Sequence, residues 1–158
     1  MSRNVSESIS MMLATESVSL GELLDARMFL EVPLAGLAAA KATEETAAAL
    51  QAAIDEAADH APGTPAFSAA DTRFHRTLAR AAGNELLLSF TDWILDVLQP
   101  QLIAEIGSIV DGEQILRQHR DIQRAVRRRQ PAAAEKAMRA HIEYLMEFQR
   151  SAGPDAPA

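Results

Sequence analysis

Residues 65–84 read PAFSAADTRFHRTLARAAGN, and this stretch predicts one amphipathic helix whose end is marked by a glycine. Its apolar side chains recur at helical spacing, and Gly83 followed by Asn84 combines a stop signal with the N-cap of the next helix. Two polar side chains interrupt the apolar face, Asp71 and His75, which are four residues apart and leave the helix on the same side. This helix therefore predicts both the fold class and a place where polar groups lie inside the fold.

The segments on both sides of this helix also repeat apolar residues at period 3.6, and none alternates at period 2 for long. Ser19, Thr43 and Asp111 are N-cap candidates ahead of three further helices, and Pro131 begins the last helix. The connections are short, so neighbouring helices should run antiparallel. The sequence therefore predicts an all-α antiparallel bundle of six to seven helices in one domain.

Composition and charge limit the classes of function. The 158 residues are 48% apolar and 23% charged, which is typical of a globular domain with a core. A net charge of −7 disfavours stand-alone nucleic-acid binding, because the neutralisation of phosphates supplies most of that affinity. The arginine cluster within 124–129 is either a solvated helix end or a contact for a partner or ligand.

Cysteine usage and the apolar runs give further limits. Cysteine is absent, which excludes thiolate metal sites, disulfides and cysteine nucleophiles. No apolar run is long enough for a membrane span, and the N-terminus does not resemble a secretory signal. We therefore expect a cytoplasmic protein with no membrane partner.

Two more predicted helices carry a histidine on their apolar face, His119 and His141. A single histidine in such a place is more often a hydrogen-bonded core residue than a ligand. Here three of the four histidines lie on apolar faces together with a carboxylate, whereas His60 falls in a loop and is expected to be solvated. One buried carboxylate and three buried imidazoles are costly unless something pairs them, and one divalent metal ion would pair all four.

The donor types indicate the ion and what it would bind. Three imidazoles and one carboxylate suit Zn or Ni, with Fe, Mn or Co as alternatives. Such a site has open positions and a net positive charge, so it should take a small anion, most simply a chelating carboxylate. Arg27 lies on the apolar stripe of its helix and could fork onto the same anion. The alternative is an internal salt bridge with Glu31 or Asp25.

The sequence favours binding over catalysis. It contains neither the His-Glu-x-x-His motif of zinc proteases nor the Glu-x-x-His pairs of di-iron bundles. No acid that could act as a general base lies on the same stripe as Asp71, so we expect no enzyme and no catalytic residue. Two alternatives stay open: a metalloenzyme acting on small organic acids, and a plain dimerisation bundle whose polar residues pair with one another.

The order of several short motifs resembles that of a known family. The chain resembles the effector-binding FCD domain of GntR-family bacterial transcription regulators, in their FadR-like branch, from about residue 20 to about residue 150. No motif is specific alone, but their order and spacing together are. The motifs are ELLDARMFLE at 22–31, DTRFH at 71–75, AAGN at 81–84, HRDIQRAV at 119–126 and AMRAH at 137–141.

The resemblance implies a bundle with a central ligand cavity. It implies that a divalent metal is held by Asp71, His75, His119 and His141, and that Arg27 helps to hold the carboxylate of a small organic acid effector. The chain would then be a metal-dependent, small-carboxylate-sensing domain that acts as a homodimer.

The resemblance also divides the chain. It implies a connector helix over 1–18, the FCD-type domain over 19–151 and a disordered tail over 152–158. The winged helix-turn-helix that family members carry has no match here. The chain is therefore either part of a longer regulator or a stand-alone sensor. DNA would be contacted only through that missing domain.

Overall fold

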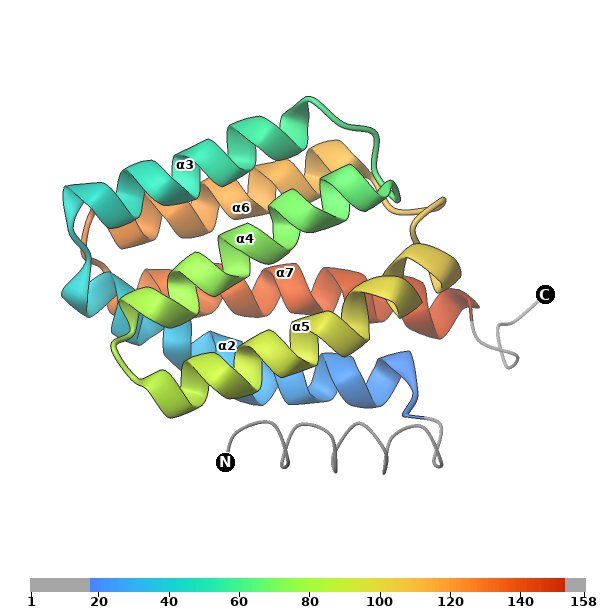
Figure 1. The fold of residues 1–158 in the computed structure, drawn as a ribbon, viewed down its shortest axis with the longest axis horizontal. Helices are drawn as coiled ribbons and strands as arrows, with labels where there is room; N and C mark the ends of the chain where they lie inside the picture. Colours follow the sequence, from blue (N-terminus) through green and yellow to red (C-terminus); the bar gives the residue numbers. More distant parts are fainter. Residues whose placement is uncertain (1–17, 153–158) are drawn as a thin grey trace.

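The computed structural model describes residues 18–152, which form six α-helices and no β-strand (Figure 1). The predicted all-α fold is confirmed. The predicted connector over 1–18 and tail over 152–158 fall almost entirely outside the described residues. The helices are α2 (Leu20–Lys41), α3 (Glu44–Ala58), α4 (Pro65–Ala81), α5 (Glu85–Glu105), α6 (Gly112–Arg127) and α7 (Pro131–Ala152).

The helices pack around one apolar core. The most extensive contacts join α2 to α7, α3 to α4, and α6 to α7, and Figure 1 shows α7 crossing the middle of the bundle. All six described helices contribute fully buried side chains to the core, α3 through Leu50 and Ile54, because each has an apolar face at helical spacing. Examples from α2, α4, α5, α6 and α7 are Leu24, Phe74, Leu98, Ile122 and Met138. No helix in the described range is long and apolar enough to cross a membrane.

Side-chain caps fix where the helices begin. Ser19 and Glu22 form a complete capping box at α2, and Thr43, Asn84 and Asp111 cap α3, α5 and α6 as predicted. Each cap accepts hydrogen bonds from backbone N–H groups that have no partner within the helix. Thr64 caps α4 in the same way. These local contacts set the register in which each helix presents its polar face residues.

Two loops touch at one end of the bundle. The loop between α3 and α4 meets the connection between α5 and α6, on the right in Figure 1. Gly63, with φ of 74°, lies against Gly107 so closely that a Cβ on Gly63 would be 2.5 Å from the Gly107 carbonyl oxygen. Gly112 approaches Pro62 in the same region. The two connections can therefore pack backbone against backbone.

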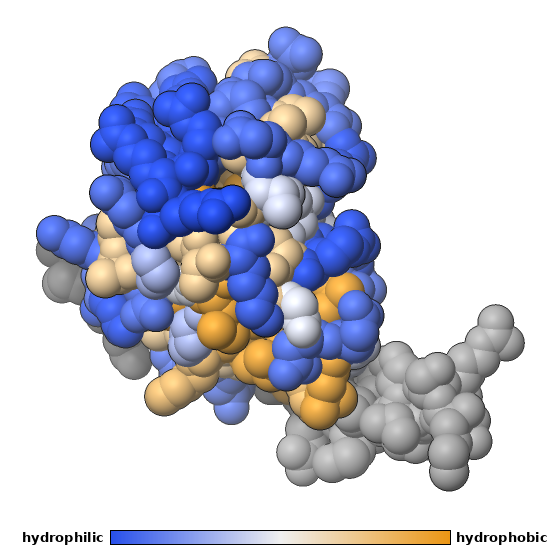
Figure 2. Space-filling model, turned by 90° about the vertical axis from the view of Figure 1, so that its left-hand side faces the viewer, coloured by the Kyte–Doolittle hydropathy of each residue, from blue (hydrophilic) through white to orange (hydrophobic). Residues whose placement is uncertain are grey.

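The opposite end of the bundle is mostly hydrophilic over its upper part, and apolar side chains gather lower down (Figure 2). The predicted arginine cluster within 124–129 belongs to α6 and the turn after it, and its arginines are exposed. Arg124 pairs with Asp121 at 3.0 Å, as expected for a solvated helix end. The large apolar side chains exposed on the described surface include Phe29, Leu37, Leu86, Phe90 and Ile109.

Candidate metal centre

The structure brings the four predicted ligand side chains to one point. Asp71 and His75 come from α4, His119 from α6 and His141 from α7, and one donor atom of each lies within 4.8 Å of the others. All four residues are buried: Asp71 is 8% exposed and each histidine 1%. Helical spacing aligns the α4 pair, and the packing of α4, α6 and α7 supplies the rest.

The three imidazole rings pack closely against one another and against a core aromatic side chain. Phe74 stacks on His119 with ring centroids 4.2 Å apart and an interplanar angle of 10°. The ring centroid of His119 lies 5.2 Å from that of His75 and 4.7 Å from that of His141. Since buried side chains in such contacts have little rotational freedom, the imidazoles are held in place by the core.

Outer contacts orient two of the imidazoles. Nδ1 of His75 lies 2.6 Å from Oε2 of Glu31, and Nδ1 of His141 lies 3.0 Å from Oε1 of Gln118. An acceptor at Nδ1 favours the tautomer with the proton on that nitrogen, which leaves the lone pair on Nε2. His141 therefore presents an unprotonated nitrogen toward the centre, as metal-binding histidines do. The corresponding nitrogen of His75, Nε2, lies 2.9 Å from Nη2 of Arg27.

Asp71 is oriented by a short chain of hydrogen bonds. Nε2 of Gln99 donates to Oδ2 of Asp71 at 2.8 Å, and Oγ of Ser68 donates to Oε1 of Gln99 at 2.6 Å. The other carboxylate oxygen, Oδ1, lies 3.4 Å from Nε2 of His119 and 3.8 Å from Nε2 of His75. One oxygen of Asp71 is thus held by the protein, and the other faces the imidazoles.

Arg27 reaches this centre from α2 and is fully buried. Its Nε and Nη2 donate to Glu31 at 2.6 and 3.1 Å, so the salt-bridge alternative is realised with Glu31, while Asp25 is exposed. Nη2 also lies 2.9 Å from Nε2 of His75, yet Nη1 has no hydrogen-bond partner among the described residues. Burial opposes ionisation of Glu31, but Arg27 and His75 hold the pKa of its carboxyl well below the usual range.

The protonation states suit coordination. Burial lowers the pKa of His119 to about 3, and burial together with the neighbouring imidazoles lowers the pKa of His141 well below its ordinary value. Burial alone would raise the pKa of Asp71, but His75, His119 and Arg27 lower it instead. At neutral pH the centre therefore contains neutral imidazoles at His119 and His141 and an ionised carboxylate.

The donor set fits a divalent transition metal. Nε2 of His141 and both ring nitrogens of His119 are buried without a hydrogen-bond partner in the described part of the chain. Buried polar atoms are rarely left unpaired in proteins, so each such atom calls for an explanation. A metal ion coordinated by Nε2 of His141 and one ring nitrogen of His119, together with His75 and Asp71, is the explanation that the donor chemistry supports.

A cavity of about 50 Å³ adjoins the centre. Asp71 and His141 form part of its wall, together with Ser68 and Gln99. The volume is several times the roughly 10–15 Å³ that one water molecule needs. The arrangement therefore combines a possible ion site with room for a small ligand beside it.

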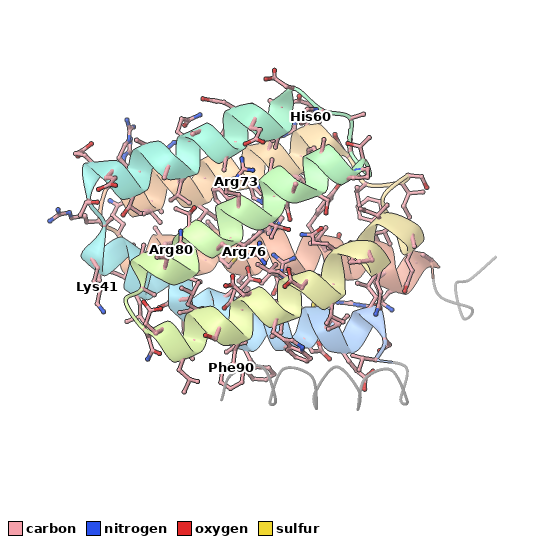
Figure 3. The ribbon with its side chains drawn as sticks, viewed as in Figure 1. Lys41, His60, Arg73, Arg76, Arg80 and Phe90 are labelled. Atoms are coloured by element: carbon pink, nitrogen blue, oxygen red, sulfur yellow. The ribbon has the colours of Figure 1, made fainter. Side chains whose placement is uncertain are left out.

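Other charged residues lie apart from the centre. His60 is exposed at the end of α3, as predicted (Figure 3). On α4, Arg73 pairs with Glu56, and Arg76 pairs with Asp92 and Asp96 of α5 at 2.8 and 2.7 Å (Figure 3). These ion pairs join helices on the surface and make no contact with the four buried side chains.

Sequence reasoning missed the residues that orient the ligands. Glu31 was considered only as a partner for Arg27, although its position four residues after a buried arginine signals that it is buried as well. Gln99, Gln118 and Ser68 gave no signal, because neutral polar residues on half-buried helix faces are common. Their roles depend on which helices become neighbours.

Comparisons with known proteins agree with this architecture. The FCD domain family matches residues 22–144. The HTH-type transcriptional repressor NanR of Cronobacter sakazakii is 33% identical over 122 residues, which are 73% of this chain and 45% of NanR. The HTH-type transcriptional regulator LutR of Bacillus subtilis is 29% identical over 143 residues, which are 87% of this chain and 65% of LutR.

A solved structure, Streptococcus agalactiae GntR, has a TM-score of 0.69 and 30% identity, and the match covers 84% of this chain and 58% of that one. The chain spans about half the length of the curated relatives that it matches. These relatives are transcriptional regulators rather than enzymes. From residue 22 to residue 144, and with this helical fold, the chain belongs to the FCD domain family.

Proposed function

We propose that this chain is the effector-sensing domain of a GntR/FadR-like transcription regulator, and that it senses a small carboxylate through a bound divalent metal. The observation that carries the proposal is the convergence of one carboxylate and three imidazoles within 4.8 Å, beside a cavity. Membership of the FCD family and the likeness to named transcriptional regulators support the regulatory role.

The ion would be held by Asp71, His75, His119 and His141. Zn or Ni suits this set best, with Fe, Mn or Co as alternatives, because imidazole-rich sites with one carboxylate favour these metals. When bound, the metal would supply a Lewis-acidic centre with open positions for an anion. Glu31, Gln99 and Gln118 would keep the ligand side chains in their coordinating orientation.

The charges in the centre favour an anionic ligand. Glu31 already neutralises Arg27, so Asp71 alone would offset a divalent ion and one positive charge would remain. Nη1 of Arg27 is a buried donor without a partner in residues 18–152, and a carboxylate could accept its hydrogen bond. Both features support a small organic acid as the effector.

A plain structural bundle explains fewer of the observations. Pairing within the protein accounts for Glu31, for Nε and Nη2 of Arg27 and for both ring nitrogens of His75. It leaves His119 without hydrogen bonds, although a core position could have been filled by an apolar residue at lower cost. The metal-dependent sensor keeps the contacts of Glu31 and also gives a partner to Nε2 of His141 and to one ring nitrogen of His119.

Regulation would follow from the number of helices that the site connects. The ligand side chains come from α4, α6 and α7, and Arg27 comes from α2. A ligand that binds one packing of these helices better than another shifts the population toward that packing. In a homodimer with DNA-binding domains, such a shift would change how those domains are placed.

The first test is the metal content of protein purified without a chelator. We expect about one transition-metal ion per chain, lost in His119→Ala and retained in His60→Ala, because His60 is exposed and outside the centre. The Tm of the unsubstituted chain should rise when metal is added, because a ligand that binds the folded state stabilises it. Equal metal content in the two variants would reject the assignment.

The second test is ligand binding by the metal-loaded domain. Calorimetry with small hydroxy and keto acids should show stoichiometric binding, and the acids should be recovered unchanged. Turnover of an acid would instead favour the metalloenzyme alternative. Failure of every acid to bind would reject the sensor.

A further inference from the structure

The lining and size of the cavity beside the candidate metal centre limit which acid the domain can bind. This inference rests on the proposed function. It lies between α4, α5, α7 and the connection from α5 to α6. Asp71 and His141 belong both to the cavity wall and to the cluster of four ligand side chains. An acid bound at the centre would therefore have its remaining atoms in or next to this cavity.

The wall of the cavity is almost entirely apolar. Its polar side chains besides the two ligands are Ser68, which donates a hydrogen bond to Gln99, and Gln99, which donates one to Asp71. Apart from Asp71 and His141, no ionisable side chain of the described residues lines it. A second carboxylate or a row of hydroxyl groups would lose its water here without gaining partners, which is costly. The apolar wall includes Phe67, Leu102, Ile103, Ile106, Val110 and Leu145.

The size of the cavity limits the part of the ligand that it can enclose. Its volume is about 50 Å³. At roughly 10–15 Å³ for each water-sized group, it has room for about three to five non-hydrogen atoms. A short aliphatic chain fits inside this space, whereas the end of a long acyl chain would extend out of it.

The charge balance limits the number of carboxylates. Among the described residues, Arg27 is the only fully buried arginine or lysine. It lies at the centre, and Glu31 accepts two hydrogen bonds from it. With a divalent ion and Asp71, the centre would retain one positive charge. One carboxylate neutralises that charge, and a second would be buried without a counter-charge.

We propose that the effector is a short monocarboxylic acid with an apolar tail, whose carboxylate end lies at the metal centre and whose tail of about three to five atoms fills the apolar cavity. Dicarboxylic acids and polyhydroxylated sugar acids are disfavoured. Val110, Leu102 and their neighbours on the wall are then residues that determine specificity.

The test is a calorimetric binding series with the metal-loaded chain. The probes are pyruvate, α-ketobutyrate, α-ketovalerate, α-ketocaproate and α-ketocaprylate, with α-ketoglutarate and gluconate as polar acids of comparable length. Affinity should rise about fourfold with each added methylene, as burial of a methylene predicts, until the cavity is full. It should fall for the longest acid. Equal affinity along the series, or tighter binding of either polar acid, would overturn the proposal.

Two variants change the cavity in opposite directions. Val110→Phe should fill it and lower the affinity for α-ketovalerate at least tenfold, while pyruvate and the metal still bind. Leu102→Ala should enlarge it and move the optimum to a longer acid. Ile109→Phe is the matched control, because Ile109 is the preceding residue, is 50% exposed and does not line the cavity.

The outcomes separate this inference from the proposed function. Binding of several acids without regard to tail length or polarity would overturn the inference and leave the sensor intact. Binding of metal but of no acid would overturn both. If Val110→Phe unfolds, the shift in chain-length optimum in Leu102→Ala decides, and an unchanged optimum there overturns the inference.

Discussion

Glu31 contacts both the buried guanidinium of Arg27 and the imidazole of His75, one of the predicted metal ligands. Its carboxylate accepts two hydrogen bonds from Arg27 and lies 2.6 Å from Nδ1 of His75. It therefore compensates a buried positive charge and orients an imidazole with the same group. Removing such a partner leaves the other charge buried and unpaired, so the effect should exceed that of a surface ion pair.

Glu31→Gln should lower the free energy of unfolding by about 3–5 kcal/mol, because Arg27 loses its counter-charge in the core. Metal affinity should also fall, by roughly 10–100-fold, since His75 loses the group that orients it. Urea unfolding and metal titration measure the two effects. Asp25→Asn is the control, because Asp25 is exposed on the same helix. Equal stability of the two variants would show that the buried pair contributes little.

The buried imidazoles should make the metal-free domain sensitive to mild acid. The pKa of His119 is about 3 in the folded chain, against an ordinary value of 6.5, and the pKa of His141 is also lowered. The unfolded chain therefore binds protons below pH 6.5 that the folded chain does not, and stability falls as the pH drops. The lowered pKa values of Asp71 and Glu31 act only at lower pH, below the ordinary range of carboxyl groups.

We therefore expect the Tm of chelator-treated protein to decrease from pH 7 to pH 5. His119→Ala should weaken this dependence, whereas His60→Ala should not, because His60 is exposed. Thermal melts followed by circular dichroism at matched ionic strength give the comparison. A Tm that is constant over this range would mean that the imidazoles are accessible to protons in the folded state.

At the scale of the helix, local chemistry determines most of what is seen. Asn84 is an example: its Oδ1 accepts hydrogen bonds from the backbone N–H groups of Leu86 and Leu87, and Gly83 before it has a φ of 73°. Both features depend only on neighbouring residues, so they could be predicted from the sequence. The same holds for the polar positions on apolar faces, which indicated Asp71 and the histidines.

Asn84→Ala should lower the free energy of unfolding by about 1 kcal/mol, because two N–H groups at the start of α5 lose their acceptor. Asn84→Ser should recover most of the loss, since serine is also a good N-cap. Urea titrations of the three proteins make the measurement. A serine variant as unstable as the alanine variant would point to a role of Asn84 other than capping.

At the scale of the whole molecule, the candidate centre joins some helices and not others. Its ligand side chains come from α4, α6 and α7, with Arg27 from α2, whereas α3 packs on α4 and α6 without contributing a ligand. The sequence assigned these side chains to their helices, but it did not show which helices pack against one another. The spacing of Asp71 and His75 placed two ligands on one helix, but only tertiary packing decides that His119 and His141 face them. Gln99 and Gln118 were missed for the same reason.

Metal loading should protect the backbone amides of α4, α6 and α7 from hydrogen exchange more than those of α3. The reason is that local opening of a ligand-bearing helix must break the coordination, whereas opening of α3 need not. Amide hydrogen exchange, measured by mass spectrometry with and without metal, reports the protection of each helix separately. Uniform protection over all four would indicate that they open only together.

The close contact of the two connections at Gly63 and Gly107 bears on how the size of the cavity can change between related chains. Both glycines border the cavity, and a Cβ at 107 would lie 3.0 Å from the Gly63 Cα. One methyl group there would wedge the connections apart and resize the space without touching any coordinating side chain. In the proposed sensor, the spacing of the two connections would thus alter ligand preference while the four proposed metal ligands stay in place.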